Sequence, residues 1–273
     1  MNDPVALRAV AVRLAEQAAT FVRTRRAEVF GAGAQQADAI RTKSTPTDPV
    51  TVVDTETERL LRELLAEHRP GDQVLGEEEG GSAQAPPGVP VWVIDPIDGT
   101  VNFVYGIEAY AVSVGVQIDG VAVAGAVANA ATGEIYSAAL GHGATVTRDG
   151  VSTTLRVNAI DDLTMALVGT GFSYEAEQRS RQAAVLAALL PTVRDVRRIG
   201  SCALDLCMVA SGRLDAYFED DVHVWDWAAG ALIAAEAGAV VRLPAGGSSS
   251  GDALVATAPG IAAALDAALR QTR

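Results

Sequence analysis

The sequence predicts an α+β or α/β fold with an antiparallel sheet in the N-terminal part and a mixed sheet in the C-terminal part. Residues 91–148 contain short apolar segments separated by tight turn signals such as Asp119-Gly120, and such short connections join antiparallel neighbours. After residue 162, strand-like and helix-like segments alternate, which is typical of a mixed sheet covered by helices.

The N-terminal part is expected to begin with two helices. Asp3 can cap the first helix, Pro4 suits its first turn, and apolar residues recur at helical spacing as far as Val22. The second helix is predicted to begin near Thr51 and to end at Arg69. Five strands are predicted after it, over 91–94, 110–118, 121–127, 134–138 and 144–148.

The C-terminal part is expected to alternate between the two element types. Its helices are predicted over 177–190, 202–210 and 227–237 and after Pro259. Its strands are predicted over 165–169, 196–199, 214–218, 240–243 and 254–257.

The length of 273 residues is compatible with two domains or one large domain. Within 150–162 the sequence pattern changes from consecutive strand-like segments to alternating strand-like and helix-like segments. We therefore expect an N-terminal α+β part over 1–150 and a C-terminal α/β part over 151–273 that completes the site. The low-complexity segment 246–251 is expected to be a flexible loop.

The acidic composition limits the classes of function. The chain has 21 Lys and Arg against 34 Asp and Glu, a formal charge of −13, whereas non-specific binding to nucleic acid or anionic membranes needs clustered cations. No apolar run is long enough to span a membrane, and no signal peptide is visible. Two cysteines cannot form a disulfide scaffold. We expect a cytoplasmic protein without direct nucleic-acid or membrane contacts.

Four acidic sites stand out because each follows a strand or begins a helix. They are the Glu77–Glu79 run, the Asp95–Asp98 turn, segment 219–226 with Asp226 at its end, and Asp54. Carboxylates that converge at one edge of a sheet raise each other's pKa and need a compensating cation. Mg²⁺ suits this role because it takes oxygen ligands and keeps waters that phosphate oxygens can replace.

The turn Asp95–Thr100 combines cation ligands with anion donors. The Ile97 carbonyl can face the same ion as the carboxylates, and the N–H groups of Gly99 and Thr100 can hold a phosphate. An ordinary turn is the alternative interpretation of this segment taken alone. Because nucleophile-elbow, P-loop and dinucleotide-binding motifs are absent, the pattern favours metal-assisted phosphate chemistry.

Four ordered motifs resemble those of the inositol monophosphatase family. Trp92–Phe103 is similar to its first signature and Trp225–Gly230 to its second, while Asp48–Asp54 and Gly76–Glu78 match two upstream motifs in order and spacing. The resemblance covers almost the whole chain, and Gly169–Phe172 resembles the bacterial branch. It implies a layered αβαβα sandwich, Mg²⁺-dependent and Li⁺-sensitive hydrolysis of small phosphate monoesters, and a homodimer.

The resemblance also implies a set of metal ligands. Glu77, Asp95 and the Ile97 carbonyl would hold one Mg²⁺, and Asp95, Asp98 and Asp226 would hold a second. A third, weaker ion would lie near Glu77, so that two or three ions occupy the site. Glu78 and Glu79 are expected to be solvated neighbours of Glu77.

The remaining implied roles concern the attacking water and the substrate. Thr100, hydrogen-bonded to Asp54, would help Glu77 to orient and deprotonate the water. Lys43 would lie near the outer metal and the phosphate, or be a surface lysine. The residues expected at the substrate are Asp98, Gly99, Thr100, Cys202, Glu219 and Asp226.

Some of these residues have a simpler interpretation. Asp54 could serve only the N-terminus of its helix, with Thr51 as the cap, and Glu219 could be a solvated charge at the rim. His223 is expected to be a structural loop residue, and Trp225 is expected to pack rather than to bind substrate.

The expected function is hydrolysis of myo-inositol 1-phosphate or a similar phosphorylated polyol. Alternative substrates that share the metal motifs are fructose 1,6-bisphosphate, histidinol phosphate and adenosine 3′,5′-bisphosphate. A hypothesis of another class is a regulatory protein that binds RNA polymerase or ribosomal RNA factors.

Overall fold

The computed structural model describes residues 2–31, 39–43, 45–244 and 252–271, so the loop expected over 246–251 lies outside the described residues. The longer helices are α1 (Pro4–Phe30), α2 (Val52–His68), α4 (Ala176–Leu189), α5 (Cys202–Ala210), α6 (Val224–Glu236) and α7 (Ala262–Gln271). None of the helices in the described ranges combines the length and the apolarity needed to cross a bilayer.

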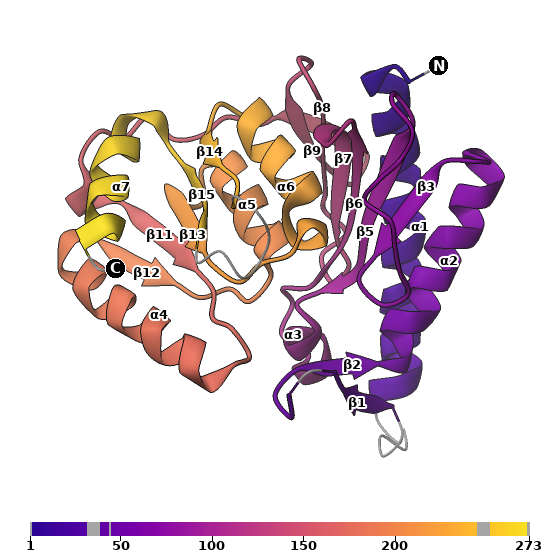
Figure 1. The fold of residues 1–273 in the computed structure, drawn as a ribbon, viewed down its shortest axis with the longest axis horizontal. Helices are drawn as coiled ribbons and strands as arrows, with labels where there is room; N and C mark the ends of the chain where they lie inside the picture. The colour runs from indigo at the N-terminus through magenta and orange to yellow at the C-terminus, as the bar shows by residue number, and fades with distance from the viewer. Residues whose placement is uncertain (1, 32–38, 44, 245–251, 272–273) are drawn as a thin grey trace.

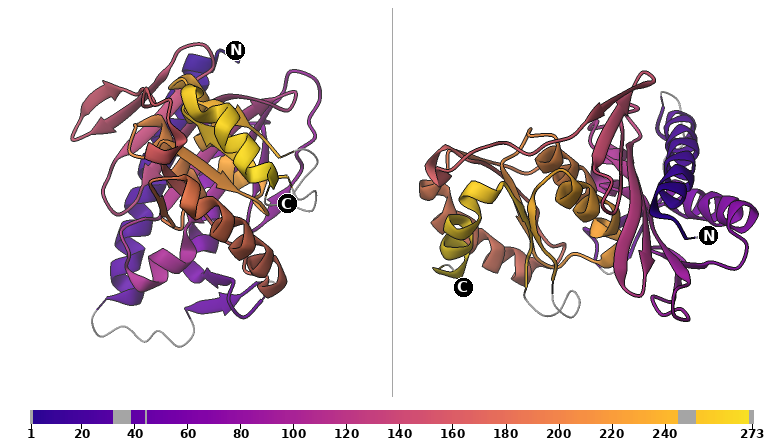
Figure 2. Two further views of the ribbon diagram at one scale, coloured as in Figure 1. Left: turned by 90° about the vertical axis from the view of Figure 1, so that its left-hand side faces the viewer. Right: turned by 90° about the horizontal axis from the view of Figure 1, so that it is seen from above.

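The chain forms five layers, in the order helix, sheet, helix, sheet, helix (Figure 1). Helices α1 and α2 cover one face of the larger sheet, α5 and α6 lie between the two sheets, and α4 and α7 cover the outer face of the smaller sheet. The view from above in Figure 2 shows α1 and α7 at opposite ends of the molecule. The αβαβα sandwich implied by the resemblance is confirmed.

The larger sheet has the strand order β10-β9-β8-β7-β6-β5-β3-β4. Its strands are β3 (Gln73–Gly76), β4 (Gly80–Gly81), β5 (Pro90–Asp98), β6 (Ala111–Ile118), β7 (Val121–Asn129), β8 (Ile135–Ala139), β9 (Ala144–Arg148) and β10 (Val151–Thr154). From β5 to β9 the strands form the antiparallel series predicted from the turn signals. The unexpected β10 extends this sheet to Thr154.

The pairing of β3 with β5 departs from the antiparallel expectation, because these two strands are parallel. The chain reverses at β4, and residues 82–89 return it to the end of the sheet where β3 begins. Gln73 therefore lies opposite Val91 and Gly76 opposite Ile94. The carboxyl ends of both strands therefore meet at one edge, which brings Glu77 beside Asp95.

The smaller sheet is mixed, as predicted. Its strand order is β12-β11-β13-β15-β14, with parallel pairing around β11 and antiparallel pairing at β15. The strands are β11 (Leu167–Thr170), β12 (Asp195–Arg197), β13 (Ala216–Glu219), β14 (Val240–Arg242) and β15 (Leu254–Thr257). The remaining elements are the hairpin β1 (Ile40–Thr42) and β2 (Pro49–Thr51), the short helix α3 (Thr100–Tyr105), and 3₁₀ turns at Leu163–Met165, Leu190–Thr192 and Pro259–Ile261.

Apolar side chains fill the spaces between the layers. Strands β6 and β7 are buried on both faces along most of their length, because helices cover the larger sheet on both sides. Consecutive residues of β13 pack into different apolar clusters, because Tyr217 contacts the cluster of α5 and α6 and Phe218 contacts the cluster of α7. The two sheets are thus packed on the same central helices, whose N-terminal ends carry candidate site residues.

Candidate active site

A cleft of about 460 Å³ gathers the predicted site residues from both parts of the chain. Its lining includes every residue predicted for the site except Asp54, which is fully buried behind Thr100. The predicted residues that line it are Lys43, Glu77, Asp95, Ile97, Asp98, Gly99, Thr100, Cys202, Glu219 and Asp226. Segments separated by more than 100 residues thus form one site.

Two of the carboxylates are held at helix N-termini. Asp98 Oδ2 accepts hydrogen bonds from the Ser201 hydroxyl and from the Ala203 N–H, at 2.7 Å, where α5 begins. Asp226 lies in the first turn of α6, and its Oδ2 accepts the N–H of His223 at 2.6 Å. The exposed N–H groups at these helix ends partly offset the negative charges, so that the acids can be buried.

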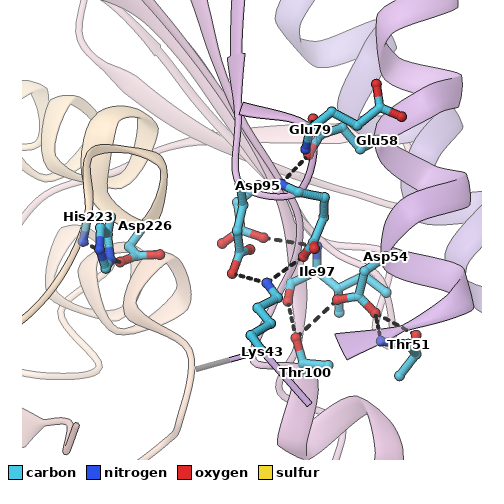
Figure 3. Close-up of polar contacts among 12 residues, drawn as sticks. Lys43, Thr51, Asp54, Glu58, Glu79, Asp95, Ile97, Thr100, His223 and Asp226 are labelled. Atoms are coloured by element: carbon cyan, nitrogen blue, oxygen red, sulfur yellow. Dashed lines mark hydrogen bonds and ion pairs between the residues drawn. The ribbon is translucent and has the colours of Figure 1, made fainter. Parts of the chain in front are cut away.

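The turn expected over Asp95–Thr100 is instead the irregular end of β5 followed by the start of α3, and it connects three predicted residues with Asp54 (Figure 3). Asp95 Oδ1 accepts the Ile97 N–H at 3.0 Å, and Thr100 Oγ1 lies 3.0 Å from the Ile97 carbonyl and 3.1 Å from Asp54 Oδ1. The other oxygen of Asp54 accepts the Thr51 N–H at 2.9 Å. The expected Thr100–Asp54 hydrogen bond is therefore present, and Asp54 also completes the capping box of α2, whose N-cap is Thr51.

Gly99 permits the tight passage from β5 into α3. Its φ is 93°, and a Cβ atom at this position would approach the carbonyl oxygens of Ala109 and Gly200 to 2.9 Å. Both the left-handed backbone and the close approach require glycine. The N-terminus of α3 therefore begins directly beside the carboxylates.

Lys43 provides positive charge at the acidic end of the cleft. Its Nζ lies 2.6 Å from Glu77 Oε1 and 2.5 Å from Glu78 Oε1, so it is more than a surface lysine. The expectation that Glu78 is solvated is wrong, because its side chain is 9% exposed and bonded to Lys43. Burial and the neighbouring Glu77 raise the pKa of Glu78 to about 7.

Glu58 is a structural acid that sequence reasoning missed. It is fully buried on α2, and its carboxylate accepts the N–H groups of Glu78 at 2.7 Å and Glu79 at 3.0 Å. These bonds fix the backbone that presents Glu77. The available signal was its position on the buried face of α2, one turn before Leu61.

Burial and mutual repulsion raise the pKa of the clustered carboxyl groups. Burial is the main cause for Asp54 and for Asp98, whose pKa values rise to about 6. The pKa values of Asp95 and Asp226 also rise well above the ordinary value, through burial and then the negative charge of Glu77. A bound cation would relieve this repulsion.

The opposite wall of the cleft carries Glu219 and Cys202. Glu219 is half-buried and accepts a hydrogen bond from Tyr217, so it is not a solvated rim charge. Burial raises the pKa of Glu219 to about 7 and that of the Cys202 thiol well above its ordinary value. Arg198, which sequence reasoning did not single out, also lines this wall.

Two aromatic rings close one side of the cleft. His223 and Trp225 stack with ring centroids 4.8 Å apart and an interplanar angle of 2°. Trp225 lines the cleft as well as packing against the apolar core, whereas Trp227 packs between apolar clusters. Both rings line the cleft, and His223 lies beside Asp226 (Figure 3).

The donor set matches the chemistry of a hard divalent cation. Carboxylate oxygens and the Ile97 carbonyl are the ligand types that Mg²⁺ prefers, and burial together with the negative charge of Glu77 raises the pKa of both Asp95 and Asp98, an effect that a bound cation would oppose. Across the described ranges, no three acidic, histidine or cysteine side chains lie close enough together to ligate one ion as they stand. Binding an ion would therefore require side chains such as Glu77 to turn toward it.

Comparisons with known proteins agree with this site. The model of the inositol monophosphatase family matches residues 3–273. The inositol-1-monophosphatase of Mycobacterium leprae is 64% identical, over 99% of this chain and 95% of that protein. The solved structure of Mycobacterium tuberculosis SuhB superimposes with a TM-score of 0.85 at 56% identity, over 100% of this chain and 99% of that chain.

A more distant relative has a different name. The Nus factor SuhB of Vibrio cholerae is 38% identical, over 80% of this chain and 81% of that protein. The family match nevertheless extends over both parts of the chain and includes every segment that lines the cleft. The chain therefore belongs to the inositol monophosphatase family and is an enzyme of the phosphatase class.

Proposed function

We propose that this phosphatase hydrolyses myo-inositol 1-phosphate, or a closely similar phosphorylated polyol, with bound Mg²⁺. The observation that carries the proposal is the set of buried carboxylates with raised pKa values directly beside the Gly99–Thr100 turn. The name of the Mycobacterium leprae relative supports the choice of inositol 1-phosphate.

The proposed ligand sets divide the carboxylates between two ions. Glu77, Asp95 and the Ile97 carbonyl would hold one Mg²⁺, and Asp95, Asp98 and Asp226 would hold the other, with a third ion near Glu77 at higher concentration. Bound Mg²⁺ would supply activation of a water molecule and neutralisation of charge on the phosphoryl group and the leaving oxygen. Li⁺ is expected to inhibit at the same site.

The groups proposed to act on the attacking water are already connected. The Thr100 hydroxyl can donate a hydrogen bond to Asp54, 3.1 Å away. Its oxygen is then free to accept a hydrogen bond from the water. Glu77 would accept the proton that the water loses. Since the Asp54–Thr100 pair is buried, its geometry is fixed before substrate arrives.

The remaining contacts would orient the ester. The N–H groups of Gly99 and Thr100 would hold phosphate oxygens, with Lys43 near the phosphate or the outer ion. Cys202 and Glu219 would face the polyol, and Asp98 and Asp226 would contact the substrate from the metal side. In-line attack is then a matter of positioning and charge neutralisation.

Phosphate release from inositol 1-phosphate, measured with Mg²⁺ and with a chelator, tests the proposal. Metal-dependent release is expected, and its absence from folded protein would contradict the proposal. Comparing kcat/KM for fructose 1,6-bisphosphate, histidinol phosphate and adenosine 3′,5′-bisphosphate then tests the choice of substrate.

The similarity to the Vibrio cholerae Nus factor favours a second candidate function, a regulatory role through transcription or ribosomal RNA factors. Rescue of a deletion strain by the inactive Asp95→Asn variant would support this role, and failure of an expressed, folded variant would oppose it. We further propose that the protein is cytoplasmic and that it forms a homodimer. Size-exclusion chromatography with light scattering would test the oligomeric state.

A further inference from the structure

The wall of the cleft opposite the main acidic cluster is supported by a buried tyrosine that does not itself line the cleft. Tyr217 is fully buried, and its hydroxyl donates a hydrogen bond to Glu219 Oε2. The Cys202 thiol lies next to the same hydroxyl, and each group influences the pKa of the other. One phenol therefore contacts both of the residues expected to face the polyol.

The backbone of β13 fixes this phenol rigidly. Tyr217 and Glu219 are two residues apart on one strand, so their side chains point to the same face of the sheet. Tyr217 pairs with Gly169 of β11 on one side and with Ala256 of β15 on the other. Since the strand is central in the sheet, the hydroxyl cannot move away from Glu219 without disturbing both neighbours.

Gly171 restricts the Glu219 carboxylate from another direction. A Cβ atom at residue 171 would lie 1.9 Å from Glu219 Oε2 and 2.1 Å from its Oε1. The carboxylate therefore packs directly against the backbone after β11, in space that a side chain at 171 would occupy. The tyrosine hydroxyl and this backbone together define one orientation of the carboxylate.

We propose that Tyr217 is a positioning residue that determines hydroxyl selectivity, by holding the Glu219 carboxylate where it accepts hydrogen bonds from substrate hydroxyls. An ionised carboxylate only accepts hydrogen bonds, and its two oxygens match hydroxyl donors on neighbouring carbons of a polyol. A site built to bond a substrate hydroxyl discriminates against an analogue that lacks it. This inference rests on the proposed phosphatase function and names the group that sets its preference for polyol esters.

The primary test is Tyr217→Phe, which removes the hydroxyl and keeps the ring. We compare kcat/KM for inositol 1-phosphate with kcat/KM for phenyl phosphate, which has no hydroxyl near the ester. The ratio of the two is expected to fall about tenfold, mainly through a higher KM for inositol 1-phosphate. Equal losses for both esters, or no loss for either, would overturn the proposal.

Tyr136→Phe is the matched control. Tyr136 is also a buried tyrosine whose hydroxyl donates to a glutamate, Glu134, at 3.2 Å, but neither residue lines the cleft. The control is expected to leave the ratio within twofold of the wild-type value. A tenfold change in this variant too would show that the ratio follows general core damage, and it would overturn the proposal.

A double-mutant cycle tests whether Tyr217 acts through Glu219. Glu219→Ala is expected to lower the ratio strongly, and adding Tyr217→Phe to it should change the ratio less than twofold further. Independent, multiplicative effects would overturn the proposal.

Gly171→Ala provides a test that does not depend on folding of the tyrosine variant. The added methyl would displace the flexible carboxylate of Glu219, so this variant should lower the ratio in the same direction. An unaltered ratio in both variants, with both esters hydrolysed by the wild type, would overturn this inference alone. Absence of Mg²⁺-dependent turnover of either ester by the wild type would overturn the proposed function and this inference with it.

Discussion

In two regions of the molecule, the cleft and the start of β8, buried acids have pKa values that shift in opposite directions. In the cleft, burial and neighbouring carboxylates raise the pKa of Asp95 well above its ordinary value. At the far end of the larger sheet, burial alone would raise the pKa of Glu134, but Arg213 and Arg148 outweigh it and lower the pKa to about 2. Only the second acid has its counter-charges supplied by the protein.

This difference separates structural from functional acids. Glu134 accepts from Arg213 Nη2 at 2.8 Å and pairs with Arg148, so its charge is neutralised in the folded chain. The cleft brings Asp95 and Asp98 together with Asp226. Their negative charges are offset mainly by helix N-termini and by Lys43, which pairs with Glu77. A cluster of acids that is left short of positive charge is prepared for an added cation.

The largest effect is expected for Asp95→Asn, because Asp95 belongs to both proposed ligand sets. Its kcat for inositol 1-phosphate should fall by at least about 10²-fold, the scale for loss of one electrostatic group at a reaction centre. Without metal, the variant should be more stable than the wild type by about 1 kcal/mol, since a buried repulsive charge is removed. Steady-state kinetics and urea unfolding in a chelator measure both effects, and wild-type turnover would refute the ligand assignment.

Mg²⁺ is expected to stabilise the wild type through the same cluster. At 100 times its dissociation constant, a ligand that binds only the folded state adds about 2.7 kcal/mol to the free energy of unfolding. Asp226→Asn should lose most of this gain, whereas Glu134→Gln should retain it. Thermal unfolding across a Mg²⁺ titration checks this, and equal gains in all three proteins would place the ion outside the cleft.

The residues that could be predicted are those whose spacing is local. Asp95, Ile97 and Asp98 lie within four residues of each other at the end of β5, and Asp226 lies in the first turn of a helix, so motif and element boundaries located them without knowledge of the fold. The structure confirms that they share a cleft with Glu77.

What could not be predicted depends on contacts between distant segments. The position of Glu58 on the buried face of α2 does not reveal its role, which depends on the loop after β3 docking on its carboxylate. The parallel pairing of β3 with β5 depends on the route of residues 82–89, which no local pattern encodes. Strands β1 and β10 are exposed along their whole length, so they carry no alternation of apolar residues that would indicate a strand.

Glu134→Gln is expected to have the opposite effect on stability from Asp95→Asn. The amide keeps the shape but loses the charge that binds two arginines, at a cost of about 1–2 kcal/mol at pH 7. Because the folded-state pKa is about 2, below the ordinary 4.5, the glutamate's contribution is present above pH 4.5 and is lost as the pH falls toward 2. Urea unfolding at pH 7 and pH 3 should show the gap narrowing, and a gap that stays constant would contradict the ionic account.

The smallest effect is expected for Lys43→Gln, which tests the cation that the protein itself places in the cleft. The side chain of Lys43 is 24% exposed, so loss of its ion pairs with Glu77 and Glu78 should cost metal-free protein only about 0.5–1 kcal/mol. Since Lys43 occupies an oxygen of Glu77 that the first ion would need, the Mg²⁺ concentration for half-maximal activity should fall by about two- to fivefold. Arg62→Gln is a suitable control, because its guanidinium pairs with Glu58 on the far side of the same loop and does not line the cleft. A higher Mg²⁺ requirement in Lys43→Gln would mean that the lysine assists the binding of the ion instead of competing with it. In that case Lys43 would be part of the metal site and not a counter-charge that the protein supplies in place of the metal.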